Sequence, residues 1–431
     1  MKPRHLLPVT ALALTLFGCA TEITSIESDF GFRPEKNGER TGPGPEQSGD
    51  IPQPLNLGQR THILLEVDGG GIMGITPALV LAGLEKELRA HRPGFADKHL
   101  HDLFCVCSGT STGAIITGMV AAGVPGDSIG KFYTTDGVEL FESKAVNPYP
   151  IFPLFRPKFK RKVFQESLYS SLEKSGIDRR IRLNQMYHGP LLLIATYDLC
   201  ENRTVWFRTR EMNDGPLVYN GPTQLVDAIS ASALSAPVYF GSLPAPSVMT
   251  DHWESDGRTE YVRGAVFNDG GQGTQNNTLG ITALQAIMRN WGAHDQVVII
   301  SLGCGNSNPL DSYQARASLS GSGQLLAFLQ NEARPESTIL QWRAATFIAD
   351  QNPNVKVFRF DYVPVANSSA FNADKHKDYE NGAKIIMGRK DFARLASDLC
   401  KVPLAPTGPE APSEAPRRAE PHGKPEHTKA L

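Results

Sequence analysis

Residues 103–113 read LFCVCSGTSTG, an apolar run that leads into Ser111 between Gly109 and Gly113. A serine on a tight turn between a buried strand and a helix exposes its hydroxyl and aims the N-terminus of that helix at the reacting group. Glycines are needed on such a turn where a side chain would collide with neighbouring backbone. The stretch therefore predicts a strand at residues 103–107, a helix at residues 112–122, and a nucleophilic serine between them.

A second strand-and-turn unit, residues 63–74, reads ILLEVDGGGIMG. Because consecutive glycines have no side chains in the way, the amides of Gly69, Gly70 and Gly71 can all point at one oxygen, as an oxyanion hole requires. The stretch also satisfies the dinucleotide pattern G-x-G-x-x-G. A nucleotide fold would place an acid at the tip of the next strand, where this chain has Cys107 and Ser108. A serine hydrolase is therefore favoured over an oxidoreductase.

The size and charge of the chain bound its class. It has 431 residues, 20% of them charged, and a formal net charge of −2. That length suits one large domain with a buried core, and the near-neutral balance lacks the basic surface that nucleic acids attract. The spacing of the cysteines matches no zinc pattern. We therefore expect no nucleic-acid partner and no structural metal.

Apolar runs and helical periodicity alternate along the middle of the chain. Runs of the buried type predict strands at residues 62–67, 103–107, 191–196, 204–208, 262–267, 297–302 and 356–360. Amphipathic spacing and capping residues predict helices at residues 76–90, 112–122, 162–174, 224–232, 279–290, 335–349 and 388–399. Alternating strands and helices indicate an α/β fold, a three-layer α/β/α sandwich around a mostly parallel sheet.

Both ends of the chain differ in composition from its middle. Residues 1–19 combine a basic start, a short apolar stretch and a terminal Cys19 in a setting that resembles a bacterial lipobox, which predicts a lipoprotein-type signal peptide. An ordinary signal peptide cleaved elsewhere is the alternative, because Phe17 is unusual in that setting. Residues 20–60 and 403–431 are rich in proline, glycine and polar residues, which predicts a disordered tether and tail. We expect a domain at residues 61–402, exported and anchored to a membrane surface through lipidated Cys19.

Three motifs follow one another along the chain, namely residues 68–74 (DGGGIMG), 109–113 (GTSTG) and 269–271 (DGG). In this order the chain resembles the patatin-like phospholipases, a family of lipid acyl hydrolases, over residues 62–399. Three ordered motifs together are more specific than any one of them. The resemblance implies the three-layer fold that the alternation of strands and helices predicts.

The resemblance also implies a mechanism in which a carboxylate acts as the base. Ser111 would be the nucleophile and Asp269 its base, and the oxyanion amides would come from Gly69, Gly70 and Gly71. An aspartate can accept the proton because burial raises the pKa of a carboxyl group. On spacing alone, Asp269 is a turn-forming residue before two glycines. The implied reaction cleaves a fatty-acyl ester of a phospholipid or other lipid through an acyl-enzyme, and it requires no organic cofactor.

Two positions depart from the family pattern. Met73 stands where the glycine loop of the family usually carries arginine, and Thr278 follows Asn276 and Asn277 where the family has proline. Losing the arginine removes a positive charge that would orient a phosphate-bearing substrate, but it leaves the backbone amides in place. We therefore expect ester hydrolysis to survive and the preference for phospholipids to be the property that changes.

Two other interpretations remain open. A lipoprotein that keeps the lipid pocket but has weak catalysis would bind lipid without turning it over. An α/β-hydrolase esterase with a Ser-His-Asp triad would need a histidine after Ser111. Each candidate lies before a turn or in a polar stretch, as surface histidines commonly do; the candidates are His188, His252, His294 and His376.

Residues 149–162 interleave aromatic and basic side chains. Such a segment can contact anionic headgroups at a membrane surface. It can equally pack its aromatic rings onto the domain while its charges face solvent. The prolines within it exclude one continuous amphipathic helix.

Overall fold

The computed structural model describes residues 54–408, except for residues 145, 147–156, 201, 211–222, 238, 245–252, 256–257, 261–265, 273, 306–332, 365–369 and 372. At residues 253–255, 258–260 and 333–336 it describes the backbone alone. Cys19, His252, the predicted signal peptide and most of the predicted tether and tail lie outside the described residues. Within them, no helix is both long and apolar enough to cross a bilayer.

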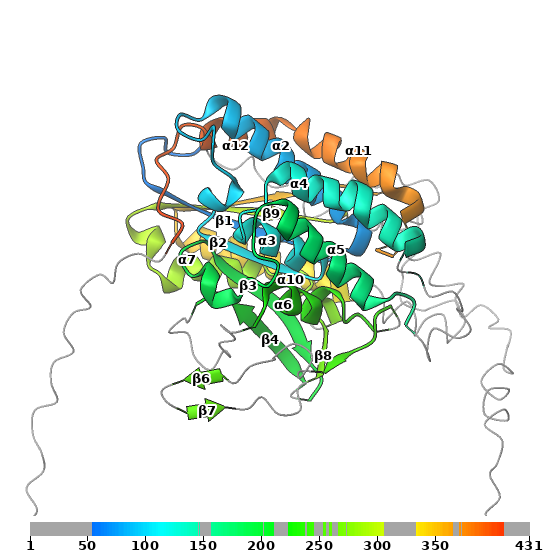
Figure 1. The fold of residues 1–431 in the computed structure, drawn as a ribbon. Coiled ribbons are helices and arrows are strands. Elements are labelled where there is room, and N and C mark those ends of the chain that lie inside the picture. The colour runs from blue at the N-terminus through cyan, green and yellow to red at the C-terminus, as the bar shows by residue number, and fades with distance from the viewer. Residues whose placement is uncertain are drawn as a thin grey trace, which may run out of the picture. The chain divides into compact units, whose positions relative to one another are not determined.

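Five parallel strands form the centre of the sheet, in the order β10-β9-β1-β2-β3 (Figure 1). Their bounds are β1 (Thr61–Val67), β2 (Val106–Thr110), β3 (Leu191–Asp198), β9 (Gln296–Leu302) and β10 (Val355–Phe360). All seven residues of β1 and of β9 are buried, as expected of parallel strands with helices on both faces. The predicted α/β fold with a mostly parallel sheet is confirmed.

Three antiparallel strands extend this sheet beyond β3. β4 (Arg203–Arg208) pairs along one edge of β3, β8 (Val266–Asp269) pairs with its last three residues, and β5 (Leu243–Pro244) pairs with β8. A separate two-stranded ribbon consists of β6 (Trp253–Ser255) and β7 (Arg258–Glu260). β8 is the strand that carries Asp269 to the site.

Helices cover both faces of the sheet, which makes three layers (Figure 1). One face carries α3 (Thr112–Ala121) and α6 (Leu225–Ala233) against the central strands. Around them lie α2 (Ile75–His91), α4 (Gly126–Lys131), α5 (Arg161–Lys174), α11 (His376–Met387) and α12 (Lys390–Leu399). The other face carries α7 (Leu279–Met288) and α10 (Ala333–Gln351).

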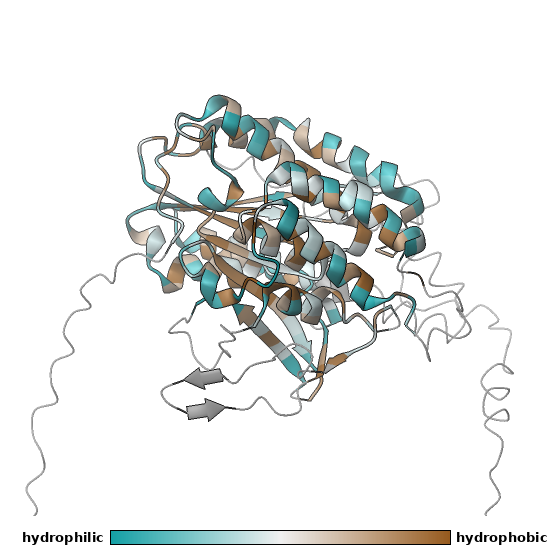
Figure 2. Cartoon of the chain, viewed as in Figure 1, coloured by the Kyte–Doolittle hydropathy of each residue, from teal (hydrophilic) through white to brown (hydrophobic). Residues whose placement is uncertain are grey.

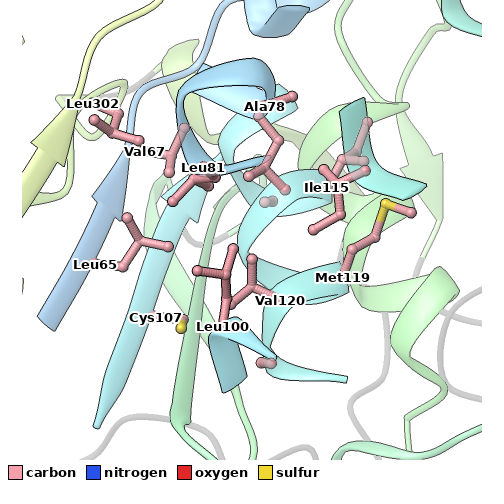
Figure 3. Packing of buried hydrophobic residues seen from close by; sticks show 14 of the residues in the cluster. Leu65, Val67, Ala78, Leu81, Leu100, Cys107, Ile115, Met119, Val120 and Leu302 are labelled. Atoms are coloured by element: carbon pink, nitrogen blue, oxygen red, sulfur yellow. The ribbon is translucent and has the colours of Figure 1, made fainter. Parts of the chain in front are cut away.

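Alternation along the strands divides the core into two clusters. Ile63, Leu65 and Val67 belong to the cluster under α2 and α3, whereas Leu64 belongs to the cluster under α7. Figure 3 shows Leu65 and Val67 beside side chains of α2 and α3. Figure 2 shows hydrophobic strands in the middle and many hydrophilic positions on the outer helices. This is the pattern of a sheet buried on both faces.

Most predicted elements agree with the structure to within a few residues, but the strand predicted at residues 103–107 is displaced. Residues 262–265 of the strand predicted at residues 262–267 lie outside the described residues. β2 runs over Val106–Thr110, so Ser111 follows its strand directly. The polar residues Ser108 and Thr110 are fully buried because other segments cover the faces of β2, and their hydroxyls find partners there, Thr278 for Ser108 and the Gln275 carbonyl for Thr110. Apolar content alone therefore placed the strand too early.

Two helices and the ordered ends of the domain also differ from the predictions. The sequence analysis predicts neither α4 nor α11. α4 has only six residues, too few for a periodic signal, whereas the buried residues of α11 do follow helical spacing within a mostly polar segment. Part of the predicted tether and tail packs on the sheet. Leu55 is buried, the Thr61 amide donates to the Pro403 carbonyl, and the Ala405 amide donates to the Thr61 carbonyl. Main-chain pairing with the start of β1 explains why residues 403–405 pack on the domain.

Asp227, in the first turn of α6, should make the stability of the fold depend on pH. Burial raises its pKa to about 6, so between about pH 4 and pH 6 the folded state holds a proton that the unfolded state has released, and stability falls as the pH rises. We predict that Asp227→Asn increases the free energy of unfolding at pH 7.5 by about 1–2 kcal/mol and leaves it nearly unchanged at pH 4. Urea denaturation at both pH values measures this.

Asp391→Asn is the matched control with the opposite sign. Hydrogen bonds from Arg389 lower the pKa of Asp391 against the effect of its burial, so this change should reduce stability at pH 7.5. An equal gain at pH 4 and pH 7.5 in Asp227→Asn would contradict the ionisation argument.

Candidate active site

Ser111 occupies a strained turn between β2 and α3. Its φ of 54° and ψ of −121° lie in a region that non-glycine residues seldom adopt, which is typical of a nucleophile held by its surroundings. A Cβ atom at Gly113 would overlap the carbonyl oxygen of Val67. The start of α3 therefore packs directly against the end of β1, as the flanking glycines predict.

Ser232, from α6, supports this turn and was not assigned a role from the sequence. The Ser111 amide donates to Ser232 Oγ at 2.9 Å, and the Ser232 hydroxyl donates to the carbonyl oxygen of Ala195 at 2.6 Å. Ser232 is fully buried, so water does not compete for the donors and acceptors of these hydrogen bonds. The only signal in the sequence was a small-residue segment around it, which says nothing about its partner.

Asp269 reaches the site through the pairing of β8 with β3. Thr110, at the end of β2, lies opposite Ala195, and Asp269 lies opposite the next residue, Thr196. Since β4 occupies the other edge of β3 over the same residues, β2 and β8 share one edge and meet end to end. The structure thus brings Ser111 and Asp269 together. The Gly271 amide donates to Asp269 Oδ1 at 2.8 Å and orients the carboxylate.

The glycine loop lies beside Ser111. A Cβ atom at Gly69 would lie 3.3 Å from Cβ of Ser111, and the Gly69 amide donates to the backbone carbonyl of Asn276 at 2.9 Å. Gly71 has a φ of 55° and leaves no room for a side chain against the Ala370 carbonyl. Of the three predicted oxyanion amides, that of Gly69 therefore already donates to the Asn276 carbonyl. Gly70 and Gly71 line a pocket together with Ser111.

This pocket has a polar wall and an apolar wall. Its volume is about 60 Å³. The apolar wall includes Tyr239 and Phe371, whose rings stack with their centroids 3.4 Å apart. The lining residues are Gly70, Gly71, Ser111, Ala236, Pro237, Tyr239, Asp269, Gly271, Gln272, Asn276, Ala370 and Phe371.

A family model described as patatin-like phospholipase matches residues 65–280, half of the chain, including the glycine loop, Ser111 and Asp269. The chain belongs to the patatin-like phospholipase family.

Individual relatives share modest identity with this family member. Patatin-like protein 1 of Oryza sativa subsp. indica is 30% identical over 282 residues, which cover 60% of this chain and 62% of the relative. Patatin-like protein 2 of the same rice is 28% identical and covers 59% and 63%, so the chain spans less than two thirds of either rice protein. Patatin-2-Kuras 4 of Solanum tuberosum is 24% identical over 382 residues, 84% of this chain and 92% of the relative.

A crystal structure of VipD from Legionella pneumophila aligns with a TM-score of 0.35 at 12% identity, over 79% of this chain and 67% of that one.

Met73, the departure from the patatin-like glycine loop, is turned away from the pocket. It is 4% exposed and belongs to the main hydrophobic cluster. Packing in the core explains why an unbranched apolar side chain is accommodated there. The loop of this patatin-like protein therefore presents backbone amides, without a charge from position 73.

The histidines considered for a triad lie elsewhere in the described chain. His188 and His294 are exposed and precede β3 and β9, so they lie at the amino-terminal ends of the parallel strands, whereas Ser111 lies at the carboxyl-terminal end of β2. His376 begins α11, and its Nδ1 lies 2.9 Å from the carbonyl of Ala373. Among the described residues that line the pocket, none is a histidine.

Where it is described, the segment at residues 149–162 buries Phe159 and leaves Lys158, Lys160 and Lys162 exposed. Phe159 is buried among aromatic rings, and Arg161 donates to the carbonyls of Leu234, Phe240 and Gly241. These bonds brace the loop that carries Tyr239 to the pocket. Residues 149–156 lie outside the described residues, so the membrane-contact hypothesis is untested there.

Ser232→Ala should loosen the turn at Ser111. We predict a stability loss of about 1–2 kcal/mol, because two buried hydrogen bonds lose their partner, and about 10- to 100-fold slower labelling of Ser111 by a fluorophosphonate, because the turn shifts. Ser230→Ala, another buried serine of α6 that bonds to Val226 and Gln165, is the control. It should cost stability without slowing the labelling, and equal labelling rates in both variants would refute the role of Ser232.

Proposed function

We propose that this patatin-like protein is a lipid acyl hydrolase that cleaves carboxylic esters through Ser111 and Asp269. The observation that carries the proposal is the convergence of Ser111, Asp269 and the amide-bearing residues Gly70 and Gly71 on one pocket. Membership of the family supports the coarse reaction class. The ends of β2 and β8, which meet beside β3, supply the two catalytic groups.

In the proposed reaction Asp269 is the general base. Its carboxylate takes the Ser111 proton as the hydroxyl oxygen attacks the acyl carbonyl, and it returns that proton to the leaving alcohol. Water then attacks the acyl-enzyme with Asp269 again as base, which releases the fatty acid and restores Ser111. The hydrogen bond from the Gly271 amide keeps the carboxylate in one orientation during both steps.

The oxyanion would be held by the glycine loop. Gly70 and Gly71 line the pocket beside Ser111, and their amides carry partial positive charge without needing a side chain. Gly69 contributes differently from the prediction, because its amide holds the Asn276 segment against the loop. The N-terminus of α3 adds its dipole at the nucleophile.

The apolar wall indicates where the acyl group would lie. The apolar residues that line the pocket are Ala236, Pro237, Tyr239, Ala370 and Phe371. Since Met73 is buried in the core, position 73 provides no cation for a phosphate. The proposed substrate is therefore selected mainly through its acyl ester, and a phospholipid is one member of that class.

Ser111→Ala and Asp269→Asn should each abolish turnover of a chromogenic acyl ester, with a loss of about 10³-fold or more in kcat. The wild type should show a burst of released alcohol, because the acyl-enzyme accumulates. A fluorophosphonate lipid should label Ser111, and peptide mass spectrometry locates the adduct.

His294→Ala and His376→Ala are the controls and should retain the wild-type rate. Loss of turnover in His376→Ala with an active Asp269→Asn would move the chain to the triad class. Stoichiometric lipid binding without burst, turnover or labelling would make it a lipid-binding protein instead.

We also propose that the domain is tethered to a membrane surface through a lipid on Cys19, which lies outside the described residues. The support is the signal-like composition of residues 1–19. Cells fed labelled palmitate should incorporate it into the wild type and not into Cys19→Ala. Equal incorporation in the two would show that the anchor is elsewhere or absent.

A further inference from the structure

A buried ionic network lies beneath the glycine loop. Arg359, from β10, makes a two-pronged contact with Asp68, with Nη2 to Oδ2 at 2.7 Å and Nη1 to Oδ1 at 3.2 Å. Its guanidinium also donates to Ser301 Oγ at 2.7 Å and to Asp361 at 3.1 Å. The side chain of Arg359 is 2% exposed. Asp68 directly precedes Gly69, so the network ends at the loop.

The register of the sheet assembles this network. Arg359, Ser301 and Glu66 lie opposite one another on β10, β9 and β1. The Ser301 hydroxyl donates to Glu66, and the other oxygen of Glu66 accepts the Thr278 amide at 3.1 Å. Three parallel strands thus place a polar row on the face that α7 covers, and this row contacts the N-terminus of α7.

The same network holds the segment opposite the glycine loop. Asn277 Nδ2 donates to Asp68 Oδ1 at 2.7 Å, and the adjacent Asn276 accepts the Gly69 amide and lines the pocket. Asp68 is therefore the common partner of Arg359, on one side, and of the Asn276–Asn277 segment, on the other. A shift of Asp68 would move two walls of the pocket together.

Charge makes Arg359 the critical member. Burial, and then the charge of Asp68, raise the pKa of Glu66 well above its ordinary value. Arg359 forms its shorter ion pairs with the other two carboxylates, those of Asp68 and Asp361. Arginine suits this position because its planar fork binds both carboxylate oxygens. Without Arg359, the negative charge of Asp68 would remain buried beside the place where the oxyanion forms.

We propose that Arg359 is a positioning residue of the site, which holds the glycine loop and the Asn276–Asn277 segment in register through Asp68. It does not line the pocket among the described residues, so it acts through Asp68 and not on substrate. Its kinetic consequence rests on the proposed hydrolase function, whereas its effect on the position of the loop does not. The sequence of the glycine loop does not predict this cation, because Arg359 belongs to the distant strand β10.

The test compares Arg359→Met, Arg359→Lys and the control Lys356→Met, which removes a cation from the same strand. In Arg359→Met we expect kcat for a chromogenic acyl ester to fall about 100-fold with KM changed less than about threefold, because the loop is displaced. Arg359→Lys should recover part of that loss, because it keeps the charge without the fork. Lys356→Met should match the wild type.

Hydrogen exchange measured on the peptide covering residues 67–74 provides the readout that does not need activity. The loop amides should exchange faster in Arg359→Met and at the wild-type rate in Lys356→Met. If the wild-type protein shows no hydrolysis and no fluorophosphonate labelling, the proposed function is refuted. Faster loop exchange in Arg359→Met would then still support the positioning role. Unchanged loop exchange with reduced kcat would overturn the positioning role and leave the function standing.

A double-mutant cycle tests whether Arg359 acts through Asp68. If Arg359 acts through Asp68, then Arg359→Met should cost little further kcat in an Asp68→Asn background, in which the carboxylate charge is already gone. Additive losses in the cycle would overturn the proposal. Should Arg359→Met alone fail to fold, the double variant and Arg359→Lys carry the same test.

Discussion

One edge of β3 serves two strands, and the candidate site depends on that sharing. β2 pairs in parallel with the first part of the edge and β8 in antiparallel with the last part, so the two strand ends meet beside Ala195 and Thr196. Main-chain ladders, not flexible side chains, therefore determine where Ser111 and Asp269 lie. Because one strand places both residues, Ser111 and Asp269 keep their separation even if the surrounding loops move.

Close backbone contacts hold the rest of the site against this edge. The turn at Ser111 is strained, by about 1–3 kcal/mol for such a conformation, and the buried contact with Ser232 and the packing of Gly113 on Val67 hold it in place. The glycine loop is braced from two directions, by Ala370 at Gly71 and by the Arg359 network at Asp68. Each brace comes from a part of the chain far from the loop.

Local patterns in the sequence predict much of this arrangement. The run at residues 62–67 matches β1 to within one residue, and the flanking glycines predict the turn at Ser111 because small residues are needed there. The predicted start of β2 is wrong, since the burial of Ser108 follows from the cover of α7 over this face of the sheet and not from its own polarity. Ser232 and Arg359 escaped prediction because their partners are set by tertiary register; a charged residue inside a buried strand, as at Arg359 and Glu66, was the available hint.

The contact between Ala370 and the glycine loop has a consequence for the order in which the chain becomes competent. Ile72 donates to the Ala370 carbonyl at 2.8 Å, and β1 takes its second pairing partner from β9. Both partners follow Ser111 and Asp269 in the sequence, and Ala370 also follows β10, the last strand of the sheet. Ser111, Asp269 and a braced glycine loop therefore come together only when nearly all of the domain has been made. A chain that ended before residue 370 would carry Ser111 and Asp269 without the contact that holds the loop.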